Sequence, residues 1–173
     1  GTALVTLAAG EGITTDVIPG VSFFEPSFAV LNFDPLPQLT ILDGEQLAEC
    51  YFPSFPPDIP VLIGQVYSTM VASHIKLILM AVYPDDHPVQ LVHDAGLPGQ
   101  LVEKIPLYKL DRSKRIGLRS VLYLPPLAEG SSLESFQQVI SRLRAPGGCP
   151  WDREQDHQSL RPNLLEETYE ALA

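Results

Sequence analysis

Basic residues and cysteines are scarce in this sequence of 173 residues, and long apolar runs are absent. Lysine and arginine number 11 against 21 acidic residues, and the net charge of −10 argues against general nucleic-acid binding. The two cysteines, Cys50 and Cys149, form no C-x-x-C pair, so we expect free thiols in a reducing cytoplasm. No apolar run approaches the roughly 20 residues that span a bilayer, and no signal segment opens the chain, so no membrane partner is expected.

The residues that are present are enough to form a core, because 45% of them are hydrophobic. Residues 1–101 hold eleven acidic residues and one basic residue, whereas residues 102–126 hold two acidic and six basic residues. The basic segment is interpreted as a solvated loop that offsets a negative neighbour, with a phosphate-binding patch as the alternative. The sequence opens on Gly1 rather than Met, which predicts an internal fragment, a trimmed chain or a tag scar.

Short apolar segments alternate with helical patterns along most of the chain. Strands are predicted at 16–18, 39–42, 61–63, 89–93, 100–106 and 120–124, and helices at 2–9, 23–31, 68–82, 132–144 and 160–172. Residues 43–60, which include four prolines, are predicted to be an irregular loop, and residues 146–150 a turn. Ser131 and Glu134 form a capping-box pattern before the fourth helix. The alternation predicts an α/β fold, a layered mixed sheet with flanking helices, whose strand order stays open.

Unusual residues gather near the end of the chain. A turn leads to the single tryptophan, Trp151, and then to a predicted helix that carries Glu166, Glu167 and Glu170. Residues four apart lie on one helix face, so these carboxylates gather there and suit a hard cation such as Mg²⁺. The alternative interpretation is a solvated acidic face.

One long ordered motif resembles the start of a MazG-type nucleoside triphosphate pyrophosphohydrolase. It reads Cys149-Pro150-Trp151-Asp152-Arg153-Glu154-Gln155, then His157-x-Ser159-Leu160, then Leu164-Leu165-Glu166-Glu167-x-x-Glu170. That family is all-helical and converts nucleoside triphosphates to monophosphates and pyrophosphate with Mg²⁺. The resemblance implies metal ligands at Glu166, Glu167 and Glu170, a catalytic role for Glu167, and nucleotide binding by Trp151, Asp152 and Arg153.

The MazG motif departs from the family in one respect. A Glu-x-x-Asp on a later helix completes the family's metal site, and this sequence reaches Ala173 before such a pair. Only half of the metal site is therefore expected in these residues, and the chain by itself is expected to lack the activity.

The first part of the chain is similar to the C-terminal lobe of tetrapyrrole (corrin and porphyrin) methylases. The similarity lies in Ile18-Pro19-Gly20-Val21-Ser22, in Gly64-Gln65-Val66, and in Pro88-Val89 leading to Ala95-Gly96-Leu97-Pro98-Gly99-Gln100. Those enzymes bind S-adenosylmethionine between two lobes. The resemblance implies that the cofactor would be approached by Pro19, Gly20, Gly64, Gln65, Ala95 and Gly96.

This second resemblance also has departures. The N-terminal lobe is absent from the sequence, Gly96 stands where the methylases usually have threonine, and Gln65 stands where many have methionine. The alternative interpretation is that the glycines only form tight turns.

Together the resemblances predict three segments: a methylase-like lobe at 1–126, a linker at 127–131 and a truncated MazG start at 132–173. The first functional hypothesis is nucleotide pyrophosphohydrolysis, with nucleoside triphosphates as partners. The second is S-adenosylmethionine-dependent methylation of a tetrapyrrole. The third is a non-catalytic module that dimerises or regulates the protein. A homo-oligomer is expected, since the apolar stripe of the helix at 132–144 most often packs against partner helices.

Overall fold

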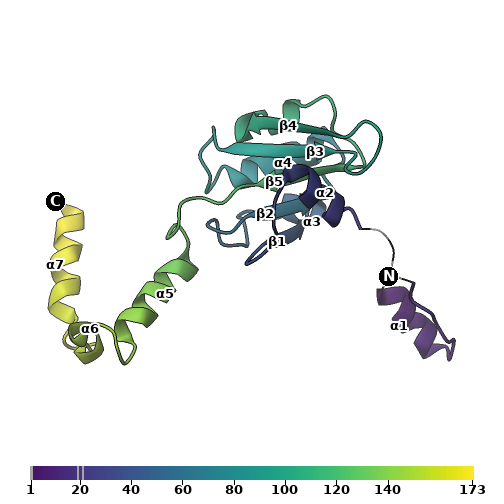
Figure 1. Cartoon of the computed structure of the whole chain (residues 1–173). Helices are drawn as coiled ribbons and strands as arrows, with labels where there is room; N and C mark the ends of the chain where they lie inside the picture. Colours follow the sequence, from purple (N-terminus) through teal and green to yellow (C-terminus); the bar gives the residue numbers. More distant parts are fainter. Residues whose placement is uncertain (1, 19, 21) are drawn as a thin grey trace.

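A computed structural model describes residues 2–18, 20 and 22–173 of the chain (Figure 1). The elements follow one another as α1 (Thr2–Gly10), α2 (Phe24–Leu31), β1 (Thr40–Asp43), α3 (Gly44–Ala48), β2 (Val61–Gly64), α4 (Thr69–Leu79), β3 (Pro88–His93), β4 (Leu101–Pro106), the 3₁₀ helix η1 (Leu107–Arg112), β5 (Ser120–Leu124), α5 (Leu133–Arg144), α6 (Pro150–Glu154) and α7 (Arg161–Leu172).

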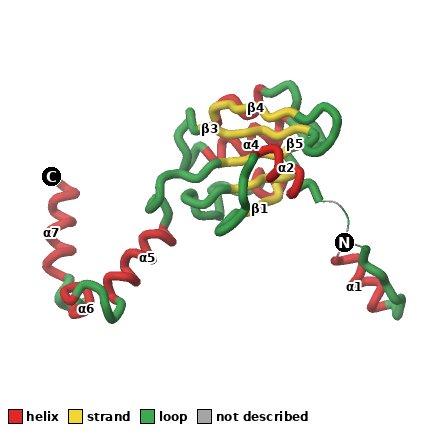
Figure 2. Tube along the Cα trace, in the orientation of Figure 1, coloured by secondary structure: helices red, strands yellow, loops and turns green. Residues whose placement is uncertain are grey.

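The five strands form one mixed sheet in the order β1-β2-β5-β3-β4. β1 and β2 run parallel, and every other neighbouring pair runs antiparallel. Helices cover the sheet, with α2 on one face and α4 on the other (Figure 2). This arrangement confirms the predicted α/β class and supplies the strand order that the sequence left open.

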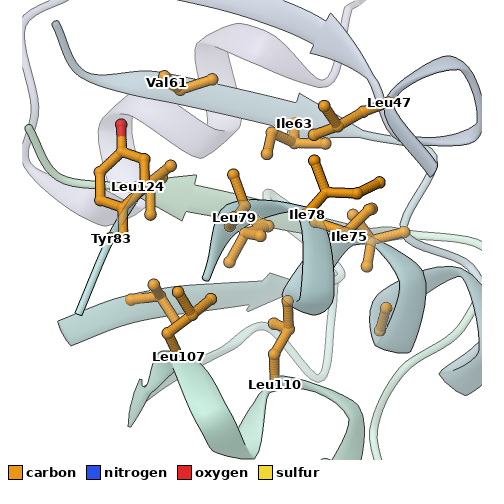
Figure 3. Packing of buried hydrophobic residues seen from close by; sticks show 14 of the residues in the cluster. Leu47, Val61, Ile63, Ile75, Ile78, Leu79, Tyr83, Leu107, Leu110 and Leu124 are labelled. Carbon is orange, nitrogen blue, oxygen red and sulfur yellow. The ribbon is translucent and has the colours of Figure 1, made fainter. Parts of the chain in front are cut away.

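The larger core lies between the sheet and the layer formed by α3, α4 and η1. Every residue of β2 and β5 is buried, as expected for central strands with both faces covered. Val61 and Ile63 of β2 face α4, where Ile75 and Leu79 meet them together with Leu124 of β5 (Figure 3). The apolar face of α4 thus follows the helical period that its sequence predicts.

A smaller core lies on the opposite face, under α2. Leu62 and Val92 point to this side, because side chains alternate along a strand. Phe28 of α2 and Phe33, which follows it, pack here, and the rings of Phe33 and Tyr123 have centroids 5.0 Å apart. α2 is therefore fixed over the middle of the sheet.

Two predicted segments in the first half were wrong. Residues 16–18 do not form a strand, since in the described part of the chain the sheet pairs no strand with them and Val17 and Ile18 stay exposed. Residues 43–60 are not wholly a loop, since α3 lies within them. The Asp43 carboxylate accepts hydrogen bonds from the backbone N–H groups of Glu45 and Gln46, at 2.8 and 3.4 Å, and so caps α3.

Three further differences concern the second half. The expected basic loop contains η1, because burial of Leu107 and Leu110 in the core orders it. The expected turn at 146–150 runs into α6, with Pro150 in the first helical position. The cap of α5 is Ser132 rather than Ser131, since the Ser132 hydroxyl accepts from the Ser135 N–H at 3.0 Å.

The helices α5, α6 and α7 extend beside the sheet rather than packing over it, and α1 likewise stands apart (Figure 1). None of the residues in α5, α6 and α7 is buried. The start of α5 is held to the sheet domain by Asp58, which accepts hydrogen bonds from the hydroxyls of Ser132, at 2.8 Å, and Ser135. The hydrogen bond from the Ser135 hydroxyl is the main reason why the pKa of Asp58 is lowered.

In the described residues, no helix has the length and apolar character needed to cross a membrane.

We expect Ile75→Ala to lower the free energy of unfolding by about 2–5 kcal/mol, because it removes a fully buried side chain and leaves a cavity. The matched control is Leu77→Ala on the same helix, where the side chain is 62% exposed and little should change. Urea unfolding followed by circular dichroism measures both. Equal losses in the two variants would contradict the packing described for α4.

Candidate functional site

A pocket opens at the end of the sheet where β2 and β3 finish and β5 begins. Its volume is about 390 Å³. Its apolar lining comes from Phe23, Pro26, Leu97, Leu118 and Val121, and its polar lining from Ser22, Gln65, Arg119 and Ser120. Ala95 and Gly96 complete the wall, and we call this hollow the apolar pocket. A mostly apolar concavity with a few polar groups is the usual form of a small-molecule site.

The backbone beside the apolar pocket is held in the left-handed region at several positions. Gln65, directly after β2, has φ of 59°, and Asp94, directly after β3, has φ of 50°. Residues other than glycine pay a conformational cost in this region, and such strain concentrates at functional sites. Gly96 has φ of 74° and packs against Pro26, where an added Cβ would lie 3.0 Å from the proline Cβ.

The structure brings three of the predicted cofactor residues together, because Gln65, Ala95 and Gly96 all line the apolar pocket. Gly64 does not line the pocket itself but lies behind the Phe23 ring, which does. A Cβ at Gly64 would be 2.9 Å from that ring, so glycine makes room for it. Gly20 is exposed, with open space around the position of an added Cβ. Pro19 lies outside the described residues.

Sequence reasoning missed the charged pair at the rim of the apolar pocket. Arg119 contacts Asp94 across the two loops, with Nε and Oδ1 3.3 Å apart, and the Arg119 side chain is 68% exposed. The Asp94 N–H also donates to the Arg119 carbonyl at 3.2 Å, which ties the loop after β3 to the segment before β5. The basic composition of residues 102–126 was the available signal, but it did not single out Arg119.

A buried histidine network lies beside this pair and was also missed. His93, 2% exposed, ends β3, and its Nδ1 lies 2.9 Å from Ser120 Oγ on the neighbouring strand. Its Nε2 lies 2.9 Å from Glu103 Oε2 on β4, and the Ser113 hydroxyl donates to the same carboxylate. The Gly117 N–H donates to Ser120 Oγ at 2.9 Å. The network therefore links Ser120, in the wall of the apolar pocket, to Glu103 on the edge strand β4.

The network sets the ionisation of Glu103. Burial acts to raise the pKa of this carboxyl group, but the hydrogen bonds from Ser113 and His93 and the nearby charge of Arg115 outweigh burial. The pKa of Glu103 therefore lies below its usual value of 4.5, and the carboxylate form is favoured.

The predicted metal residues lie far along the chain, on α7. Glu166, Glu167 and Glu170 are exposed there, as the sequence predicted for a helix face. In the described residues, no group of three or more His, Cys, Asp or Glu side chains is arranged to hold a metal ion. The ligand role of the three glutamates thus stays a prediction.

The predicted nucleotide-binding residues Trp151, Asp152 and Arg153 share the short helix α6. Two side chains hold α6 to the residues before it. Arg144 at the end of α5 donates to the Asp152 carbonyl at 2.6 Å, and Arg153 donates to the carbonyl of Pro146, in the turn after α5, at 3.1 Å. Before α7, the Asp156 carboxylate accepts from the N–H groups of Gln158 and Ser159, each at 2.8 Å. These bonds order the segment that joins α5 to α7.

The sheet domain has the fold of the tetrapyrrole methyltransferases, and the helical segment after it is similar in sequence to the start of a MazG-type pyrophosphohydrolase. Uroporphyrin-III-C-methyltransferase from Thermus thermophilus matches 72% of this chain with a TM-score of 0.57 and 18% identity, over 56% of its own length. The cobalt precorrin-4 methyltransferase CbiF matches 72% of the chain with a TM-score of 0.52 and 14% identity, over 57% of its length. At identities of 18% and 14%, this similarity shows that the chain shares the fold of these enzymes.

The sequence relatives cover both parts of the chain. YabN of Bacillus subtilis (strain 168), named as an uncharacterized protein, is 37% identical over 166 residues, which are 94% of this chain and 33% of YabN. The nucleoside triphosphate pyrophosphohydrolase/pyrophosphatase MazG of Thermotoga maritima is 46% identical over 43 residues, 25% of this chain and 17% of that protein. The nucleoside triphosphate pyrophosphohydrolase of Escherichia coli (strain K12) is 44% identical over 43 residues, 24% of this chain and 16% of that protein. No family model matches the chain.

We expect stability to fall as pH drops through the folded-state pKa of Glu103. Because that pKa is depressed on folding, its contribution is complete above the unfolded value near 4.5 and is lost as the carboxylate is protonated below it. Glu103→Gln should therefore lose less stability than the parent chain between about pH 5 and about pH 3. Urea unfolding at several pH values tests this, with Glu129→Gln in the exposed loop before α5 as control. An unchanged pH dependence in Glu103→Gln would contradict the network.

Proposed function

We propose that the protein containing these residues hydrolyses nucleoside triphosphates to monophosphates and pyrophosphate at its MazG-like helices. The observation that carries the proposal is the 43-residue similarity to two pyrophosphohydrolases, together with a Glu-Glu-x-x-Glu pattern on a helix. The similarity spans about a sixth of those two relatives and a third of YabN.

The donors on α7 fit Mg²⁺ in chemistry. Carboxylate oxygens are the hard ligands that this ion prefers, and Glu166 and Glu170 are one helical turn apart. In the described residues, no lysine or arginine forms an ion pair with Glu166, Glu167 or Glu170. When bound, Mg²⁺ would neutralise charge on the triphosphate. Glu167 would accept the proton of the attacking water, and Glu166 and Glu170 would hold the ion.

The helix α6 would form the mouth of the nucleotide site. Trp151 is half-exposed, which leaves a flat ring surface for stacking on a base. Asp152 and Arg153 follow it directly. The Asp152 carbonyl accepts a hydrogen bond from Arg144 of α5, and Arg153 donates to the Pro146 carbonyl in the preceding turn, so these bonds hold the helix in place. The proposal assigns these residues to nucleotide binding rather than to the chemical step.

We expect the longest natural protein that contains this sequence to release pyrophosphate from nucleoside triphosphates only when Mg²⁺ is present. Glu167→Gln should lower kcat by about a hundredfold or more, because the side chain keeps its size but loses its basicity. Glu129→Gln, outside the motif, should keep the parent rate. A coupled pyrophosphate assay over ribo- and deoxyribonucleoside triphosphates measures all three proteins. Full activity in Glu167→Gln, or none in the parent, would refute the proposal.

The apolar pocket supports a second candidate, S-adenosylmethionine-dependent methylation of a tetrapyrrole. A structural neighbour, uroporphyrin-III C-methyl transferase from Thermus thermophilus, was solved with S-adenosyl homocysteine, with a TM-score of 0.51 and 15% identity. The pocket here has the size and apolar lining for a nucleoside, and Gly96 lets backbone approach it. The cofactor would supply the methyl group, and Gln65, Ala95 and Gly96 would orient it.

We expect S-adenosylhomocysteine to bind the chain if this candidate holds, and Ala95→Trp to abolish binding by filling the apolar pocket. Ala128→Trp, in an exposed loop, places the same ring outside the pocket and should leave affinity unchanged. Isothermal titration calorimetry measures the three dissociation constants. Binding that survives Ala95→Trp would place the ligand elsewhere, and absence of binding in the parent chain would remove the candidate.

A further inference from the structure

A second hollow of about 250 Å³ adjoins the apolar pocket, and residues 118–120 form a wall common to both. Its polar lining comes from His93, Asp94, Arg115, Gly117, Arg119 and Ser120. We call it the basic pocket, because two guanidinium groups and a single carboxylate, that of Asp94, line it.

Much of the hydrogen-bonding capacity of the two arginines is left for a ligand. Within the described part of the chain, Arg119 uses its Nε for Asp94, and Arg115 uses one terminal nitrogen for the Gly99 carbonyl at 3.2 Å. A guanidinium carries five N–H donors in a planar fork that matches phosphate or carboxylate oxygens. The remaining donors of both side chains thus suit a tetrahedral anion better than a neutral group.

The neighbouring acidic groups are already engaged. Asp94 pairs with Arg119, and Glu103, which also feels the charge of Arg115, accepts hydrogen bonds from His93 and Ser113. Ser120 is fixed between Gly117 and His93 at the junction of the two pockets. An anion in the basic pocket would therefore meet two guanidinium groups, each of which has one contact within the chain, and carboxylates that already have partners.

The two pockets differ in chemistry in a way that matches one class of ligand. The apolar pocket offers the Phe23 ring and the Pro26, Leu97 and Leu118 side chains to a flat ring system, and the basic pocket offers cationic donors next to it. We propose that the adjoining pockets together bind a nucleoside phosphate, with the nucleoside in the apolar pocket and the phosphate in the basic pocket. The proposal does not rest on the pyrophosphohydrolase activity.

A methyl donor of the S-adenosyl type would be a poorer match for the combined site. Such a ligand carries an adenosine and a single carboxylate in place of a phosphate dianion, and its ammonium and sulfonium centres are positive. The two arginines would therefore gain less negative charge from it than from a phosphate and would repel its positive groups. The ratio of affinities for a nucleotide and for its own nucleoside therefore reports directly on the basic pocket.

The test is calorimetric titration of the 173-residue chain with AMP, GMP, CMP and UMP, with the matching nucleosides, and with S-adenosylhomocysteine. We expect at least one nucleotide to bind about tenfold tighter than its nucleoside, because the phosphate adds charge-assisted hydrogen bonds. The advantage should shrink at high salt. Equal affinities, tighter binding of S-adenosylhomocysteine, or no binding at all would each overturn the proposal.

The variants locate the phosphate. Arg115→Gln should reduce the nucleotide advantage to less than about threefold while the affinity for the nucleoside stays the same, since only the phosphate contact is lost. Lys114→Gln removes the adjacent positive charge, which lines neither pocket, and should keep the tenfold ratio. Arg115 is exposed, so circular dichroism should show both variants folded. A ratio that persists in Arg115→Gln contradicts the placement. Pyrophosphate release from nucleoside triphosphates is measured separately, so either proposal can fail alone.

Discussion

Burial of β2 and β5 on both faces is the constraint on which the rest of the structure depends. All residues of these two strands are buried, so the sheet must be covered on each side. α4 and η1 cover one face and α2 covers the other, with Ile75 and Phe28 as representative contacts. β5 runs antiparallel to both β2 and β3. The loops that leave β2 and β3 and the segment that enters β5 therefore meet at one end of the sheet, where the two adjoining pockets lie.

The end of the sheet that carries the two pockets is built from backbone conformations that a relaxed chain would avoid. Gln65 and Asp94 hold left-handed φ values directly after the strands that end there, and Asp94 fixes Arg119 beside them. The buried strands supply the stability that holds these positions. The acidic helix α7 has no such support, because none of its residues is buried. The sheet domain therefore presents a preformed pocket, whereas α7 presents the predicted metal ligands on an exposed surface.

The sequence predicted the elements whose pattern is local. β2, β5 and α4 follow from short apolar runs and a helical period, and Gln65, Ala95 and Gly96 were placed at a site through the methylase resemblance. The strand order could not be predicted, because it depends on pairing between distant segments. α3 was missed, since four prolines between residues 43 and 60 dominate the local signal over the Asp43 cap. His93, Ser120 and Arg119 come from separate segments, and only the folded sheet brings them together.

The end of the sheet at β2 and β3 is the ligand site that we propose. The most direct measurement is a map of backbone amide chemical shifts in the labelled chain as AMP is added. We expect the largest changes at Gln65, at Asp94 to Leu97 and at Arg115 to Ser120, on both sides of the wall between the pockets. Changes confined to α6 and α7, or spread evenly over the surface, would contradict it.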